Sequence, residues 1–160
     1  MNTLREQMSL DTHAFKRQVI SGLGATRTLN EGESGSLIVL DKADGIVITL
    51  PAVTTGANAG TWFEFMVGVT CTSNSYKIIT GAGTELMVGS IINCDTDTSD
   101  AVAIWKSLVA TSNISVNLNG TTKGGVKGDR IRVTNINATT WVVEGVLNGN
   151  GVVVTPFATS

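Results

Sequence analysis

Residues 36–51 read Ser-Leu-Ile-Val-Leu-Asp-Lys-Ala-Asp-Gly-Ile-Val-Ile-Thr-Leu-Pro, and this stretch decides the fold class. Two apolar runs, 36–40 and 46–50, flank a polar turn in which Gly45 can take positive φ. The second run alternates Ile and Leu with Val and Thr, as a β-strand does, and Pro51 ends it because proline lacks a backbone N–H. We therefore predict two β-strands joined as a hairpin.

The composition extends this prediction to the whole chain. Among 160 residues, 22 Thr, 18 Val and 12 Ile make about a third of the chain β-branched, which favours strands over helices. The sequence predicts an all-β fold: an antiparallel, jelly-roll-like β-sandwich or a barrel of about ten short strands. Beyond the first pair, the expected strands span 62–70, 76–80, 86–94, 101–109, 114–118, 129–134, 141–147 and 152–154. The strand at 62–70 is apolar on both faces, which predicts a strand buried between two layers. Asn148-Gly149-Asn150-Gly151 predicts a closing hairpin.

Charge and special residues narrow the functional classes. A net charge of -2, with 11 basic and 13 acidic residues, argues against a nucleic-acid binder. A single histidine, His13, leaves little basis for a histidine-rich metal site. The sequence contains no apolar run of membrane-spanning length and no recognisable secretory signal. We expect no cofactor, no metal, no nucleic acid and no membrane, with Cys71 and Cys94 both reduced.

Two loops invite binding hypotheses. Asp95-Thr96-Asp97-Thr98-Ser99-Asp100 has oxygens at alternate positions but lacks the glycine and distal glutamate of an EF-hand, so we favour a solvated loop. The stretch 120–128 is rich in Gly and Lys but does not match a P-loop, and we predict a flexible surface loop. Four basic residues could form a positive patch for an acidic partner or discourage pairing at a strand edge: Lys123, Lys127, Arg130 and Arg132.

Catalytic residues are poorly supported, and we expect no enzyme. His13 and the two cysteines have no context that identifies a nucleophile. The candidate carboxylates for a glycosidase lie in or beside predicted strands, so their geometry is unknown: Glu64, Glu85 and Glu144. Trp62 and Trp141 are predicted to pack in the core, and Trp105 is the aromatic that would bind a glycan if one is recognised.

The first 28 residues differ from the rest of the chain. They carry much of its charge and few apolar residues, and Gly22-Leu23-Gly24 interrupts any helix. We predict an extended N-terminal arm over residues 1–28 and a β-sandwich body over residues 29–160. The arm either docks on an outside surface or is a frayed tail.

The motifs around the first strand pair resemble those of small structural proteins of tailed bacteriophages. Residues 34–51 resemble a recurring signature, "SG..i.LD.A.G..itLP", and Gly60, Phe63, Phe65 and Val67 match a following "G..f.f.v". Segments 76–80, 86–89, 128–131, 141–145 and 151–157 continue the pattern. The resemblance covers most of residues 29–158 and includes head decoration (cement) proteins and fibre-associated virion proteins.

This resemblance implies a function and partners. It implies a non-enzymatic decoration protein on the outer surface of the virion capsid, made in the host cytoplasm. Such a protein forms homotrimers and clamps neighbouring subunits of the major capsid protein, often through an N-terminal arm. The alternative is a tail-fibre or receptor-binding module that recognises glycans. The candidate capsid or protomer contacts are Leu4, Met8, Phe15, Arg17, Val19, Ile20, Arg27, Pro156 and Phe157.

Overall fold

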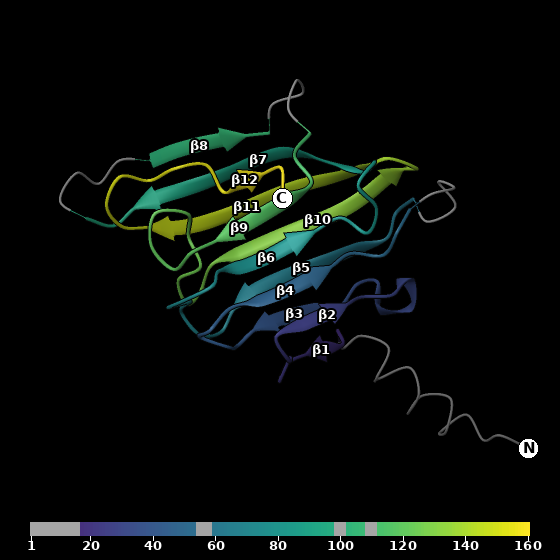
Figure 1. Ribbon diagram of the computed structural model, residues 1–160, viewed down its shortest axis with the longest axis horizontal. Helices are drawn as coiled ribbons and strands as arrows, with labels where there is room; N and C mark the ends of the chain where they lie inside the picture. The colour runs from purple at the N-terminus through teal and green to yellow at the C-terminus, as the bar shows by residue number, and fades with distance from the viewer. Residues whose placement is uncertain (1–16, 54–58, 98–101, 108–111) are drawn as a thin grey trace, which may run out of the picture.

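The chain folds as a β-sandwich. Of the two predicted all-β architectures, the sandwich is therefore confirmed and the barrel is wrong. The computed structural model describes residues 17–53, 59–97, 102–107 and 112–160. Two sheets pack face to face, and within the described residues the single helical element is the short 3₁₀ turn η1 (Glu31–Glu33). Figure 1 looks through both layers, with β8 along the upper margin and β1 along the lower one.

The two sheets differ in size. Sheet A has seven strands in the order β1 (Val19–Ile20), β3 (Leu37–Leu40), β5 (Trp62–Val67), β10 (Arg130–Asn137), β11 (Thr140–Gly149), β7 (Leu86–Asp95) and β8 (Val102–Lys106). Sheet B has five strands in the order β12 (Phe157–Ala158), β9 (Ser115–Leu118), β6 (Tyr76–Ile79), β4 (Ile46–Thr49) and β2 (Thr26–Thr28).

The predicted hairpin between residues 36–40 and 46–50 is wrong. β3 lies in sheet A and β4 in sheet B, so residues 41–45 form an arch that crosses the sandwich. The first six strands alternate between the sheets in this way, and within each sheet they pair in parallel: β1 with β3 and β3 with β5 in sheet A, β2 with β4 and β4 with β6 in sheet B. The expectation of antiparallel neighbours therefore holds only for part of the fold, including the β7–β8 hairpin and the β10–β11 pair.

Successive arches stack, and this stacking explains the glycine at position 45. The Thr72 N–H of the next arch donates to Ala43 O at 2.8 Å. Gly45 has φ of 87°, and a Cβ there would lie 2.4 Å from Ser75 O. A side chain at this position would therefore collide with the neighbouring arch as well as strain the backbone.

The core lies between the sheets and is formed by alternate residues of each strand. Sheet A contributes Ile38, Phe63, Val133 and Trp141, and sheet B contributes residues such as Ile48 and Ile78. The prediction that 62–70 is buried on both faces is wrong, because β5 buries Phe63, Phe65 and Val67 but leaves Trp62 and Met66 only half-buried. Among the described residues, sheet A is packed on one face only, and its other face is open.

The predicted hairpin at residues 148–151 is also wrong. Asn148 and Gly149 continue β11, and residues 152–154 lie outside the strands. A Cβ on Gly149 would lie 2.5 Å from Val153 Cγ1, so this glycine permits a close crossing of chain segments. The chain then reaches β12, where Pro156 and Phe157 are buried on the protein's own body.

The end of the predicted arm belongs to the sandwich. β1 pairs with β3 and β2 pairs with β4, and Ile20 is buried in the core. Residues 17–28 therefore contribute strands to both sheets. His13 and the predicted contacts Leu4, Met8 and Phe15 lie outside the described residues.

Candidate functional site

The open face of sheet A carries an aromatic and charged cluster on one half. Trp62 and Glu64 project from β5, and Arg132 projects from the neighbouring β10. The Arg17 and Arg132 guanidinium carbons lie 4.9 Å and 4.5 Å from the centre of the Trp62 ring, within the range of cation–π contacts. Arg17 also forms an ion pair with Oε2 of the Glu64 carboxylate. The second carboxylate oxygen, Oε1, lies 3.0 Å from Arg130 Nε. We name Arg17, Trp62, Glu64, Arg130 and Arg132 the Arg–Trp cluster.

The other half of this face exposes aliphatic side chains. Val146 of β11, Ile92 of β7 and Ile104 of β8 are register neighbours, so they form one row across three strands. Their exposed fractions are 52%, 38% and 69%, and Val102 beside them is 64% exposed. We name Ile92, Val102, Ile104 and Val146 the apolar patch. Exposed aliphatic residues grouped in this way mark interaction sites more often than isolated ones do.

The corresponding face of sheet B is more polar. Its outward positions include Thr28, Thr49, Lys77 and Asn117, and the Asn117 amide donates to Ser160 O at 3.3 Å. The asymmetry between the two outer faces points to sheet A as the binding side of the sandwich.

A shallow hollow joins the two halves of the sheet A face. It has a volume of about 640 Å³, and its lining includes Glu64, Arg132 and Glu144 as well as Ile92 and Val146. In register, Arg132 lies between Glu64 and Glu144, so the sign of the charge alternates across the strands. Such a surface suits a protein partner with both apolar and polar groups.

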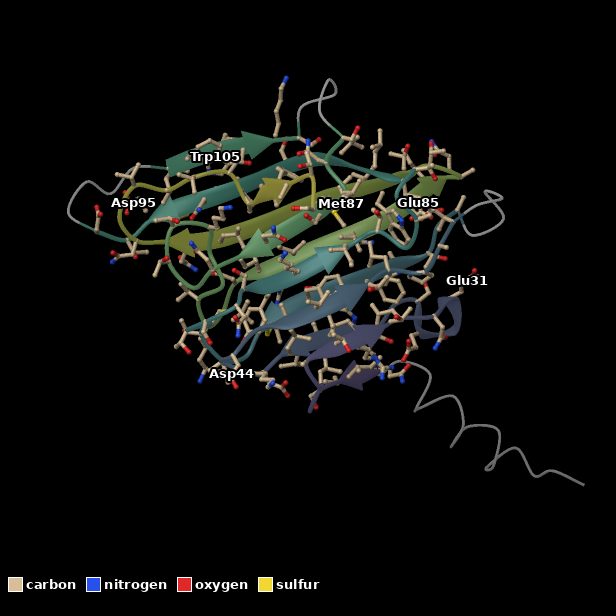
Figure 2. All side chains as sticks on the ribbon, in the orientation of Figure 1. Glu31, Asp44, Glu85, Met87, Asp95 and Trp105 are labelled. Atoms are coloured by element: carbon tan, nitrogen blue, oxygen red, sulfur yellow. The ribbon has the colours of Figure 1, made fainter. Side chains whose placement is uncertain are left out.

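The three candidate carboxylates are not brought together. Glu64 belongs to the Arg–Trp cluster, and Glu144 lies two strands away on the same face. Glu85 is buried in the interior near one end of the strands (Figure 2), where it accepts from Val53 N at 2.6 Å and from Trp141 Nε1 at 3.2 Å. Glu85 therefore holds a loop and a core tryptophan in place.

The basic residues do not form the simple positive patch considered from the sequence. Arg130 and Arg132 contact Glu64 and Trp62 on the sheet face. Lys123 and Lys127 lie in the loop before β10. The Lys127 N–H donates to Thr70 Oγ1 at 3.0 Å.

The Gly-rich loop, predicted to be a surface loop, is buried at Gly124 and Gly125, and a buried acid that sequence reasoning missed binds it. Asp129 is 1% exposed and its carboxylate accepts from Gly125 N, Val126 N and Asn148 N at 2.8, 3.0 and 2.9 Å, and from Asn148 Nδ2 at 2.7 Å. Burial raises the pKa of Asp129, although these hydrogen bonds oppose the shift. The sequence did contain a signal for this role of Asp129: an aspartate that follows several glycines and directly precedes a strand.

In the described residues the acidic loop is tied to the body of the sandwich, and two of the remaining predicted contacts lie on its first two strands. Asp97 accepts from Gly151 N at 3.1 Å, which ties this loop to the end of β11, while residues 98–100 lie outside the description. Arg27 pairs with Glu33, and Val19 is exposed on β1. Within the described ranges, no group of three or more potential ligands among His, Cys, Asp and Glu could hold a metal ion.

The tryptophans and cysteines divide between core and surface. Trp141 is fully buried, as predicted, and lies 6.3 Å from Phe63 between ring centres. Trp62 is half-buried on the open face of sheet A, so its predicted place in the core is wrong, and Trp105 on β8 is half-buried against the core (Figure 2). Cys71 is buried and Cys94 is half-buried, and both are free thiols.

No family model, curated protein or solved structure matches this chain. In the part that the structure describes, no helix has the length and apolarity needed to span a membrane. The class that fold and surface define is a two-sheet β-sandwich with one open, partly apolar sheet face.

Proposed function

We propose that this protein is a non-enzymatic virion structural protein, a decoration protein that binds the assembled capsid of a tailed bacteriophage and stabilises it. The observation that carries the proposal is the apolar patch beside the Arg–Trp cluster on the open face of sheet A. The signature in residues 34–51 supports the virion class, since it resembles decoration proteins. The partner is the major capsid protein.

The physical basis is preferential binding of the assembled state. A decoration protein that contacts neighbouring capsid subunits binds the shell better than free subunits, and this difference in affinity stabilises the shell. Each contact can be weak, because many copies act on a symmetric particle. A rigid sandwich with one partly apolar face is suited to this role.

The contacts of three acidic residues support a structural role for the protein. Glu64 bonds to two arginines, while Glu85 and Asp129 are buried and accept hydrogen bonds from neighbouring groups. These contacts assign the three carboxylates to holding the fold and its surface. The glycan-binding alternative has less support, since its candidate aromatic Trp105 is partly buried against the core and Trp62 contacts two arginines.

The first test is the copy number of this chain relative to the major capsid protein in purified particles, by quantitative mass spectrometry. A fixed ratio implying hundreds of copies supports a decoration protein. A handful of copies would move the protein to the tail or fibre, and absence from particles would reject the virion proposal.

A second test locates the binding face. Val146→Lys places a charge in the apolar patch and should weaken capsid binding in a co-sedimentation assay, whereas Thr28→Lys on sheet B should not. Equal binding by the two variants would reject the sheet A face.

The role of the arm needs a truncation at the right place. Deleting residues 1–28 would remove β1 and β2, so the arm is tested by deleting residues 1–16. We expect this truncation to lower capsid binding while the circular dichroism spectrum of the body stays unchanged. Full-strength binding by the truncated protein would reject a docking role for the arm.

A further inference from the structure

The edge strands of the two sheets differ in length and in apolar character. Sheet A ends in β1, with two residues, and in β8, with five; sheet B ends in β12, with two residues, and in β2, with three. Short edge strands limit unwanted pairing, and so do prolines and charges. β8 reads Val-Ala-Ile-Trp-Lys, and its charge lies only at the last position. It is thus the longest and most apolar free edge in the described structure.

The pairing of β8 with β7 fixes which backbone groups are free. The Ser107 N–H donates to Gly89 O at 3.0 Å, so the backbone of residue 107 faces β7. Because an antiparallel strand alternates its hydrogen-bonding direction, residues 103 and 105 also face β7. The N–H and C=O groups of Val102, Ile104 and Lys106 therefore point away from the sheet, and among the described strands none pairs with this side.

We propose that β8 pairs with β8 of a second copy of this chain, antiparallel and about a two-fold axis at Ile104. In this register Ile104 faces Ile104 of the partner subunit, and Val102 faces Lys106 of the partner subunit. The three outward residues of each strand then exchange backbone hydrogen bonds with their counterparts, with facing Cα atoms about 5.5 Å apart. The two seven-stranded sheets become one continuous sheet.

The side chains favour a second copy over another partner strand. The row Val146–Ile92–Ile104 reaches the β8 edge, and the two-fold operation continues it into the same row of the partner subunit. The one charge of the strand, Lys106, meets Val102 of the partner subunit and not another lysine. The edge is therefore self-complementary, as an isologous interface requires.

This inference does not depend on the capsid proposal, and it differs from the homotrimer that the phage resemblance implies. A cyclic trimer built through β8 would have to join it to a different edge, and the other described edges have only two or three residues. The oligomeric state in solution therefore separates the two arrangements.

The test is the mass of the purified full-length chain by size-exclusion chromatography with light scattering, over a range of concentrations. We expect a species of twice the 16.7 kDa chain mass at high concentration. Ile104→Lys places two like charges face to face on the axis and should give a monomer. Ile104 is 69% exposed, so this variant should fold, and the circular dichroism spectrum checks it. Val19→Lys, at the exposed opposite edge, should remain a dimer.

The register has its own test, by sedimentation velocity. Val102→Lys puts a lysine opposite Lys106 of the partner subunit at two symmetric positions and should raise the dimer Kd about 3- to 30-fold. Val102→Glu should not weaken the dimer, and adding Lys106→Glu to Val102→Lys should restore it. A wild-type monomer at all concentrations, a trimer, or a dimer unaffected by Ile104→Lys would overturn the proposal. A dimer lost in Ile104→Lys but equally affected by both Val102 variants would overturn the two-fold register.

Discussion

The buried carboxylate of Asp129 is expected to be a main support of the fold. In Asp129→Asn one acceptor oxygen becomes an NH₂ group, so two of the four donors around the carboxylate lose their acceptor and meet another donor. Each buried donor left without a partner costs about 1–3 kcal/mol, so for two donors we expect the free energy of unfolding to fall by roughly 2–6 kcal/mol. For a domain of this size that loss lowers Tm by roughly 4–24 °C.

The assay is urea unfolding followed by tryptophan fluorescence, with Asp44→Asn as the matched control. The Asp44 side chain is 70% exposed and its lysine contact is long, at 3.9 Å, so its replacement should change the free energy of unfolding very little. A value for Asp129→Asn within about 0.5 kcal/mol of the wild type would refute the reasoning, because that is the range of ordinary surface substitutions.

The pH dependence tests the same carboxyl group. Burial raises the pKa of Asp129, so its ionisation is less favourable in the folded chain than in the unfolded one. This group's contribution to stability is therefore complete below the unfolded pKa of about 3.9 and decreases as the pH rises through the raised folded pKa. Asp129→Asn has no ionisable group at this position, so it lacks this pH-dependent contribution. The difference in the free energy of unfolding between wild type and variant should therefore become smaller as the pH rises from about 3.9 through the raised folded pKa. A gap that widens would contradict the raised pKa.

Two further predictions follow from burial and backbone geometry. Tyr76 is the single tyrosine, and desolvation raises its pKa to about 12, so absorbance titration of the phenol should show this value in the folded protein and about 10 in denaturant. A folded midpoint near 10 would contradict its burial. Gly89→Ala would place a Cβ 1.9 Å from Val143 O at φ of 140°, so this variant should fail to fold or lose several kcal/mol of stability in urea unfolding. Gly83→Ala meets nothing within 4 Å and should unfold like the wild type, and similar stabilities of the two variants would contradict the close packing at Gly89.

The sequence could predict where strands occur but not how they pair. Alternation of apolar and polar residues, as in Ile46 to Leu50, states which side chains face the core, and the structure confirms this. The same alternation fits an arch as well as a hairpin, since in both cases the residues on each side of the turn face the same core. The choice depends on parallel partners distant in the sequence, such as β5 for β3, and no local pattern encodes them.

The candidate site, too, could be predicted from the sequence only in part. Arg130 and Arg132 were visible as charged outward residues of a strand, but their acidic and aromatic neighbours come from β5, more than sixty residues earlier. The exposure of Ile92 and Ile104 was not predictable either. An aliphatic residue in an alternating strand is expected to face the core, and only the sheet order shows which face of β7 and β8 is open.

The two buried acids, Glu85 and Asp129, have a common structural role, which also explains why Glu85 resembled a catalytic candidate. Trp141 near the start of β11 donates to Glu85, and Asn148 near its end donates to Asp129. Both carboxylates also accept from loop N–H groups, of Val53 in one case and of Gly125 in the other. A strand in the interior of a sheet obtains hydrogen bonds along its length from its neighbours, but its ends meet loops whose donors need acceptors. A carboxylate can accept several such bonds, so an acid beside a strand end is expected for structural reasons before any catalytic one.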